Sequence, residues 1–212
     1  MRAKGGAELY DLPARRPVQA FADFKLPGSA SAFSPDGRWL AYGTTNYGIR
    51  IWDLALQCEQ ASCRGNRWWV YALRFSPDSK LLASGAWDGS VWLWSVKTGT
   101  PLHPPLKGHQ SAVIPIAFSA DGKTLITGAD DRTIRWWNVT LGKEMLLFPN
   151  AFIISRYLKS EAEVNPGGDV VAWEEFRGPT IKSNNGPVHV MELPSLAQIE
   201  AREKARSQSP LR

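Results

Sequence analysis

The segment SAFSPDGRWLAYGTTNYGIRIWDL, residues 31–54, places short apolar runs on either side of tight turns. Its first turn, Ser-Pro-Asp-Gly at residues 34–37, contains a proline that fixes φ and an aspartate that can bond to the nearby backbone. The run 39–43 follows this turn, and after a second turn the run 49–54 alternates β-branched and aromatic residues with others. This alternation is typical of half-buried strands, and the three-to-four spacing of a helix is absent. We therefore expect β-strands throughout the segment.

The same pattern occurs twice more along the chain. The copies are ALRFSPDSKLLASGAWDGSVWLWSV at residues 72–96 and IAFSADGKTLITGADDRTIRWWNV at residues 116–139. The equivalent Phe33, Phe75 and Phe118 lie 42 and 43 residues apart. A period of this length is typical of the four-stranded blades of β-propellers, in which each unit buries its faces against its neighbours. The repeat predicts a set of stacked blades.

Weaker copies flank the three clear ones. At the N-terminal end, AELYDL at residues 7–12 aligns with the third strand of a blade, and RPVQAFADF at residues 16–24 aligns with the outermost strand. Toward the C-terminus lies a degenerate copy, in which a turn at residues 165–169 is followed by an expected second strand at 170–176 and an expected third strand at 188–193. These flanks extend the repeat over nearly the whole chain.

From this repeat we expect an all-β fold, a β-propeller or an open propeller fragment made of four-stranded antiparallel blades. Because the first copy begins within a blade, we also expect the chain to be the C-terminal portion of a longer propeller. The expected divisions are 1–27 (the end of a preceding blade), 28–64 (blade 1), 65–107 (blade 2), 108–150 (blade 3), 151–195 (a degenerate blade 4) and 196–212 (a polar basic tail).

The residues at the centre of the chain resemble the WD40-repeat family of β-propellers. The similarity rests on Gly108-His109, Trp52-Asp53 and the Ser-Pro-Asp-Gly turn at residues 34–37. The resemblance implies that a His, a Ser or Thr, an Asp and a Trp lock each blade by hydrogen bonds. In blade 1 only Trp52 matches cleanly, and in blade 2 Asn66 replaces the expected His. The other matching residues are His109, Thr127, Asp131 and Trp137 in blade 3, and Ser84, Asp88 and Trp94 in blade 2.

The same resemblance implies a binding face, formed by the loops before the first strand and between the second and third strands of each blade. Tryptophan and arginine are enriched in binding hot spots, and a tryptophan in a turn is not explained by strand packing. For Trp69 and Trp87, packing against their own blade remains the alternative. Carried over by position, the candidate partner-binding residues are Thr45, Arg67, Trp69, Trp87 and Asp130.

The formal net charge of +5 is concentrated at the two ends of the chain. Residues 1–16 and residues 200–212 each carry four Lys or Arg against two acidic residues, so the repeat region holds only about one of the five charges. A nucleic-acid-binding face normally gathers its cations on one surface. We therefore do not expect a nucleic-acid partner, although association through the basic ends remains an alternative.

The chain offers little that resembles a catalytic or metal site. Glu174 and Glu175 are adjacent on an expected strand, so they face opposite sides and cannot form an acid/base pair on one substrate. His103, His109 and His189 lack the mutual spacing of metal ligands. We expect no enzymatic activity, no cofactor, no metal and no small-molecule substrate.

Cys58 and Cys63 are the two cysteines of the chain, and free thiols or a disulfide remain open for them. No apolar run approaches the length of a membrane span, and the N-terminal residues do not form a signal peptide, so we expect no membrane association and a cytoplasmic location. The function expected from the repeat is a non-catalytic scaffold that binds a protein or peptide through the loop face. The alternatives are self-association or a fragment whose main partner is the remainder of its own propeller.

Overall fold

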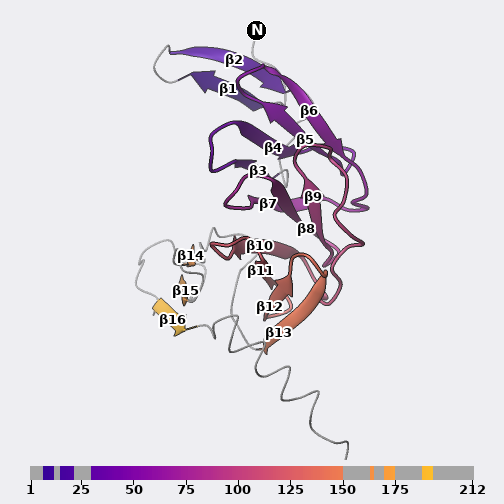
Figure 1. The fold of residues 1–212 in the computed structure, drawn as a ribbon, viewed down its shortest axis with the longest axis vertical. Helices are drawn as coiled ribbons and strands as arrows, with labels where there is room; N and C mark the ends of the chain where they lie inside the picture. The colour runs from indigo at the N-terminus through magenta and orange to yellow at the C-terminus, as the bar shows by residue number, and fades with distance from the viewer. Residues whose placement is uncertain are drawn as a thin grey trace, which may run out of the picture. The chain divides into compact units, whose positions relative to one another are not determined.

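A computed structural model describes residues 7–11, 15–21, 30–149, 163–164, 170–174 and 188–192. The chain divides into two compact units, residues 1–115 and 116–212, and each is considered by itself. The described residues form antiparallel β-strands and contain no helix (Figure 1). The all-β fold class and the antiparallel sheets expected from the repeat are therefore confirmed.

The strands group into five sheets, none of which closes on itself within the described residues. The sheet orders are β1-β2, β3-β4-β5-β6, β7-β8-β9, β10-β11-β12-β13 and β14-β15-β16. The strands are β1 Ala7–Asp11, β2 Arg16–Phe21, β3 Ser31–Phe33, β4 Trp39–Gly43, β5 Ile49–Asp53, β6 Cys58–Cys63, β7 Val70–Phe75, β8 Leu81–Ala86, β9 Val91–Ser95, β10 Val113–Phe118, β11 Thr124–Ala129, β12 Thr133–Asn138, β13 Lys143–Pro149, β14 Glu163–Val164, β15 Val170–Glu174 and β16 Val188–Glu192.

The turn between the first and second strands is closed by the same side-chain contacts in all three clear copies, as Ser-Pro-Asp-Gly, Ser-Pro-Asp-Ser and Ser-Ala-Asp-Gly. In the first, the Ser34 hydroxyl donates to the Asp36 carboxylate at 2.5 Å and accepts from the Trp39 backbone N–H at 2.8 Å. The Asp36 carboxylate also accepts from the Arg38 backbone N–H at 3.0 Å. Ser76 with Asp78 and Ser119 with Asp121 repeat the arrangement, which joins each first strand to its second.

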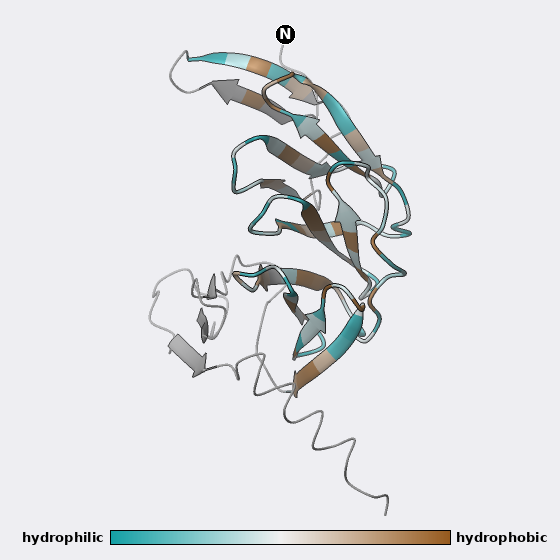
Figure 2. Cartoon of the chain, viewed as in Figure 1, coloured by the Kyte–Doolittle hydropathy of each residue, from teal (hydrophilic) through white to brown (hydrophobic). Residues whose placement is uncertain are grey.

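The core of the N-terminal unit lies between the β3–β6 sheet and the β7–β9 sheet. Alternate residues of β5 point into it, because a strand directs every second side chain to the same face. The buried residues of this core are Ala41, Ile49, Ile51, Ala61, Cys63, Val70, Leu73, Phe75, Leu82, Trp94 and Val96. The outer strand β6 is hydrophilic along part of its length, as expected for an edge that faces water (Figure 2). A single blade face is thus buried only by the neighbouring blade.

A second, smaller apolar cluster joins β1 to the β3–β6 sheet. Leu9 of β1 packs beside Trp52 and Leu54 against the buried Leu40 and Tyr42 of β4. Because Leu9 lies on the strand that the repeat aligns with the third strand of a blade, the contact resembles the packing of one blade on the next.

The β7–β9 sheet departs from the expected four strands. Its fourth position is taken by residues 100–106, which form only two isolated bridges, Trp94 with Pro101 and Val91 with Leu106. Pro101, Pro104 and Pro105 lack a backbone N–H, so this segment cannot complete a continuous ladder. The backbone N–H groups of Leu102 and Leu106 still donate to β9 at 2.8 Å each. The edge of β9 is therefore covered without a regular strand.

Cys58 and Cys63 are free thiols at opposite ends of β6. Five residue steps along a strand span roughly 16 Å, far beyond the separation that a disulfide can bridge. The disulfide that the sequence leaves open is therefore excluded between these two cysteines. Cys63 is buried in the core, and this burial raises the pKa of its thiol to about 12.

The expected strands 7–12, 16–24, 170–176 and 188–193 correspond to β1, β2, β15 and β16, each slightly shorter than predicted. The turn expected at 165–169 lies outside the described residues. The described residues also do not include Glu175, the side chains of Glu174 and His189, or the tail 196–212, so the expectations for these stay predictions.

Candidate functional site

The second and third repeats each contain a buried hydrogen bond between strands. The indole N–H of Trp94 donates to the Ser84 hydroxyl at 2.9 Å, and that of Trp137 donates to the Thr127 hydroxyl at 2.7 Å. Both bonds join the third strand of a blade to the second, and all four side chains are buried. An indole N–H buried without an acceptor would cost about 1–3 kcal/mol, so these pairs fix the blade geometry.

The other blade-locking candidates are placed as follows. Asp131 accepts from the Thr133 backbone N–H at 2.9 Å, and Asp88 accepts from that of Ser90 at 3.1 Å, so both close their turns. His109 is buried. Its carbonyl oxygen would lie only 2.4 Å from a Cβ at position 89, where Gly89 adopts a φ of +84°. Any larger residue at position 89 would therefore displace the backbone at His109.

Blade 1 has neither serine nor threonine at the position of Ser84 and Thr127. The strand register places Tyr42 where Ser84 stands in blade 2, because Leu40 pairs with Trp52 as Leu82 pairs with Trp94. Trp52 instead packs beside Leu9 in the smaller apolar cluster. Trp52 is thus a structural residue that contributes to packing across the β1–β4 contact.

A group of aromatic side chains lies on the β4–β5 turn, the β6–β7 loop, the start of β7 and the β8–β9 turn. It is here called the aromatic cluster and is formed by Tyr47, Trp69, Tyr71 and Trp87. The ring of Tyr47 meets that of Trp69 edge to face, with centroids 5.7 Å apart, and Tyr71 meets Trp87 in the same way at 6.2 Å. The backbone N–H of Trp87 donates to the carbonyl of Trp69 at 3.1 Å, which links the two pairs. Trp69 is 40% exposed and Trp87 37% exposed.

Tyr47 and Trp69 belong to different repeats, so their contact crosses from one blade to the next. Trp69 therefore contacts an aromatic ring of the neighbouring blade. Trp87 contacts Tyr71 of its own blade and still exposes more than a third of its surface. Trp68, beside Trp69 in the same loop, is also exposed. Exposed aromatic side chains gathered on adjoining loops are a common feature of protein-binding surfaces.

A polar pocket of about 260 Å³ opens beside the aromatic cluster. It forms at the end of blade 1 where Gly43 pairs with Ile49 and Ile49 pairs with Cys63, so the β4–β5 turn and the β6–β7 loop meet there. The lining residues are Thr44, Asn46, Tyr47, Gly48, Arg50, Ser62, Arg64, Gly65 and Asn66.

Four of the five predicted partner-binding residues lie in the loops of the N-terminal unit. Thr45 is exposed between two residues that line the pocket, and Arg67 is exposed in the β6–β7 loop beside Trp68. Asp130 belongs to the C-terminal unit, where it is half-buried after β11. The structure therefore brings Trp69 and Trp87 together. Arg67 lies in the loop that carries Trp69, and Thr45 lies in the β4–β5 turn that carries Tyr47.

Sequence reasoning missed Tyr47, Arg64 and Asn66 as possible contact residues. The signal for Tyr47 was present, because it is an aromatic residue within an expected turn, as Trp87 is. Arg64 and Asn66 gave no such signal. Their proximity to Tyr47 depends on how β6 leads into the next blade, which the repeat pattern alone does not reveal.

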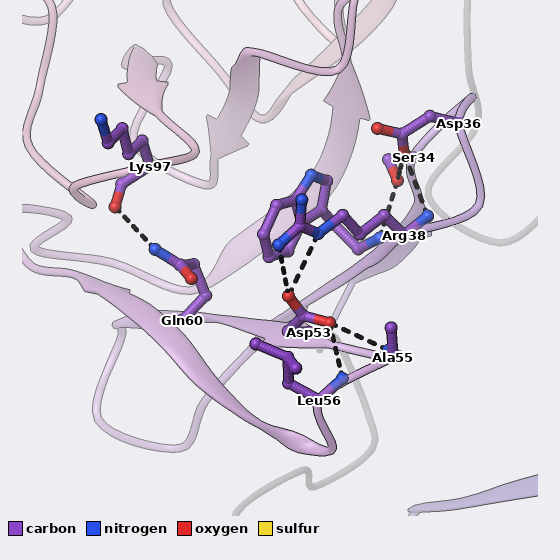
Figure 3. Close-up of polar contacts among 9 residues, drawn as sticks. Ser34, Asp36, Arg38, Asp53, Ala55, Leu56, Gln60 and Lys97 are labelled. Atoms are coloured by element: carbon purple, nitrogen blue, oxygen red, sulfur yellow. Dashed lines mark hydrogen bonds and ion pairs between the residues drawn. The ribbon is translucent and has the colours of Figure 1, made fainter.

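The opposite end of blade 1 contains an ion pair, and its residues are not among those that line this pocket. Figure 3 shows Arg38 facing Asp53, with both its Nε and Nη2 atoms bonded to one carboxylate oxygen at 3.1 and 3.0 Å. The other oxygen accepts from the backbone N–H groups of Ala55 and Leu56 at 2.9 Å each. The Leu56 N–H, together with Arg38 and the Ala55 N–H, holds the pKa of Asp53 below its ordinary 3.8.

Within the part of the chain that the structure describes, no group of three or more His, Cys, Asp or Glu side chains could hold a metal ion. The same residues include no helix long and apolar enough to cross a membrane.

Comparison with known proteins places these repeats in a family. The family model "WD domain, G-beta repeat" matches residues 29–53, 57–95 and 99–138. The chain belongs to the WD40-repeat family. Its sheets are blades of the propeller type, and the resemblance noted from Gly108-His109 and Trp52-Asp53 is confirmed.

Similar proteins include several with WD repeats. The chain is 35% identical over 89 residues to a guanine nucleotide-binding protein subunit beta-5b of Danio rerio, which covers 41% of this chain and 22% of that protein. It is 32% identical over 97 residues to a protein LST8 homolog of Drosophila melanogaster, covering 42% and 31%. It is 30% identical over 93 residues to periodic tryptophan protein 2 of Arabidopsis thaliana, covering 43% and 10%. The matched region thus spans less than a third of each of these relatives.

Proposed function

We propose that this WD40 chain is a non-catalytic scaffold that binds a protein or peptide through the loop face of its N-terminal unit. The observation that carries the proposal is the aromatic cluster, in which Trp69 and Trp87 remain more than a third exposed although each contacts another ring. Large aromatic side chains held in place by neighbours lose little conformational entropy on binding, which makes them effective anchors.

Charge and family membership support the same function. Arg67 is exposed in the loop that carries Trp69, and it forms no ion pair with any described residue. Members of the WD40 family are generally non-catalytic scaffolds, and one similar protein is by its name a subunit of a larger protein. We extend only this general role to the present chain, with Thr45, Arg67, Trp69 and Trp87 as contact residues and Asp130 as a further candidate.

The proposal also includes a cytoplasmic location. Cys58 and Cys63 are both free thiols, and Cys58 is exposed, which suits a reducing compartment.

Selection from a displayed library of random twelve-residue peptides would test the binding function. We expect the full chain to enrich a set of peptides and the double variant Trp69→Ser/Trp87→Ser to lose most of their affinity, about tenfold or more, as for central aromatic anchors. A matched control is Leu56→Ser, which removes an exposed apolar side chain at the opposite end of blade 1. Absence of enrichment by the full chain, or equal losses for the control and the double variant, would contradict the proposal.

A further inference from the structure

The pocket beside the aromatic cluster contains an amide whose hydrogen-bonding groups are unused. Both polar atoms of Asn66, Oδ1 and Nδ2, are buried and have no hydrogen-bond partner among the described residues. Asn66 occupies the position that His109 occupies in blade 3, so it replaces the residue that the family uses there to lock the blade. A buried amide without partners costs about 1–3 kcal/mol, and a ligand that satisfies it recovers part of this cost.

The two atoms of this amide require complementary groups. Oδ1 accepts a hydrogen bond and Nδ2 donates, so a ligand that satisfies both must supply one donor and one acceptor side by side. A peptide group has both, because its N–H donates and its carbonyl accepts. A lone carboxylate or phosphate supplies only acceptors and would leave Oδ1 unpaired. The chemistry at Asn66 therefore favours the main chain of a peptide.

Charge determines which peptide suits the pocket. Arg64 lines it, is exposed and forms no ion pair with a described residue. Arg50 also lines it, with one guanidinium nitrogen 2.7 Å from Glu59. No Asp or Glu side chain is among the lining residues. The pocket therefore presents net positive charge to an incoming group.

Two residues that line the pocket, Tyr47 and Gly65, affect how a ligand could bind there. Tyr47 belongs both to the pocket lining and to the pair with Trp69, so a bound segment would touch the aromatic cluster as it leaves the pocket. Gly65 lies at φ +157°, and a Cβ there would meet the Trp92 and Trp94 rings at 3.2 Å. The loop thus lies close to the stacked Trp92 and Trp94 rings, so a side chain at position 65 would not fit there.

We propose that this pocket binds an extended acidic peptide segment, with one peptide group hydrogen-bonded to Asn66 and a neighbouring Asp or Glu carboxylate paired with Arg64. This inference deepens the proposed function and rests on it, since it specifies the chemistry of the partner and the place where its acidic residue sits. The aromatic cluster then contacts the residues that flank the acidic one.

The test is a titration of the isotope-labelled full chain, followed by NMR, with two capped pentapeptides that have valines around a central glutamate or a central glutamine. We expect both peptides to shift the Asn66 side-chain amide signals and those of Gly48 and Gly65. We expect the glutamate peptide to bind about three- to fivefold more tightly, as for an ion pair that remains partly exposed.

Two variants separate the contributions. Arg64→Gln should abolish the preference for glutamate and leave the weaker binding of the glutamine peptide intact. Asn66→Asp should weaken both peptides, because it removes the donor and adds a repelling charge. The control Lys97→Gln makes the same charge change as Arg64→Gln at an exposed residue that follows β9, and it should leave both affinities unchanged.

Specific outcomes would overturn the inference. One is the absence of shifts at Asn66 with either peptide. Another is equal affinity of the unmodified chain for the two peptides. A third is that a peptide with a central phosphoserine binds whereas the glutamate peptide does not. Because Arg64 is exposed, its variant tests the charge preference even if Asn66→Asp fails to fold. If displayed peptides bind through Trp69 and Trp87 but are insensitive to Arg64→Gln, the proposed function stands and this inference fails. If nothing binds, both fail.

Discussion

At the scale of single residues, Ser79 shows how a side chain can offset an unfavourable backbone conformation. It occupies the turn position where the other two copies have Gly37 and Gly122, and it adopts the same left-handed conformation at φ +58°. Its buried hydroxyl accepts a hydrogen bond of 3.2 Å from the backbone N–H of Asp36 in the preceding blade. The serine thus connects two blades at a position where glycine would relieve strain.

We expect Ser79→Ala to lower the free energy of unfolding more than Ser79→Gly does. Alanine retains the left-handed strain and loses the hydrogen bond, a loss of about 1 kcal/mol, whereas glycine loses the bond and gains about 1 kcal/mol from the relieved backbone. Urea unfolding followed by tryptophan fluorescence measures both values. If Ser79→Gly lowers the free energy of unfolding more than Ser79→Ala does, the left-handed backbone conformation at position 79 does not destabilise the fold.

Four aspartates make the stability of the chain depend on pH in the acid range. Hydrogen bonds from Ser34, Ser76 and Ser119 hold the pKa values of Asp36, Asp78 and Asp121 below their ordinary 3.8, and the Leu56 N–H lowers that of Asp53. A lowered pKa in the folded state means that the ionised form stabilises the fold. This stability is present above the unfolded value near 3.8 and is lost as the pH falls through the lower folded values.

The urea midpoint should therefore stay nearly constant from pH 7 to about pH 5 and fall steeply below about pH 4. Circular dichroism in a series of buffers at constant ionic strength measures it. Asp53→Asn should reduce the loss between pH 4 and pH 2, because the amide oxygen can still accept from the Ala55 and Leu56 N–H groups but no longer titrates. A decline that starts near pH 6 would point to histidine instead.

At the scale of elements, the same residue of the repeat has different surroundings in successive blades. Phe75 ends the first strand of blade 2 and is 4% exposed in the core between blades, whereas Phe33 ends the first strand of blade 1 and is 59% exposed. The two sit in matching sequences. Their burial differs because it depends on which neighbouring blade packs against that strand.

Phe75→Ala should lower the free energy of unfolding by about 3–5 kcal/mol, since it removes a buried ring from a packed core. Phe33→Ala should change it by less than about 0.5 kcal/mol, as for most exposed side chains. Chemical denaturation compares the two directly, and each variant is the matched control of the other. A large loss for Phe33→Ala would mean that the first strand of blade 1 is covered in solution.

The contrast explains how far the sequence could predict the structure. Strand positions such as β4, β8 and β11 were predictable because apolar runs and Ser-Pro-Asp or Ser-Ala-Asp turns recur in the copies. Features that arise between copies were not. The contact of Tyr47 with Trp69 and the unpartnered amide of Asn66 depend on the packing of one blade on another, and the missing fourth strand of blade 2 depends on prolines outside the repeated segment.

The candidate site was predictable only in part for the same reason. Trp69 and Trp87 could be selected because a tryptophan in a loop or turn has no role in strand packing. Their backbone hydrogen bond and their shared cluster follow from the register of β7 with β8, where Val70 pairs with Ala86. Asp130 was selected by the same rule of position, and it lies in the other unit.

At the scale of the whole molecule, charge is distributed unevenly along the chain. The ends contribute about four of the five formal positive charges, while lysines of the repeats are balanced by acidic residues, as in the pairs Lys80–Asp78 and Lys123–Asp121. Clustered cations release more counterions from a polyanion than the same number of cations scattered over a surface. Any attraction of the chain to nucleic acid at low salt should therefore originate at the ends.

A variant with glutamine at Arg2, Lys4, Arg202, Lys204 and Arg206 should lose most of its affinity for a labelled DNA duplex at low salt. The slope of log affinity against log salt should fall by about one for each contacting cation removed. The measurement is fluorescence anisotropy at several salt concentrations. The matched control carries glutamine at five exposed lysines of the repeats, Lys80, Lys97, Lys107, Lys123 and Lys143, and so has the same net charge. An equal loss in both variants would mean that net charge alone governs the attraction. A larger loss in the control would place a basic surface on the blades themselves and favour a nucleic-acid partner over the peptide proposed for the loop face.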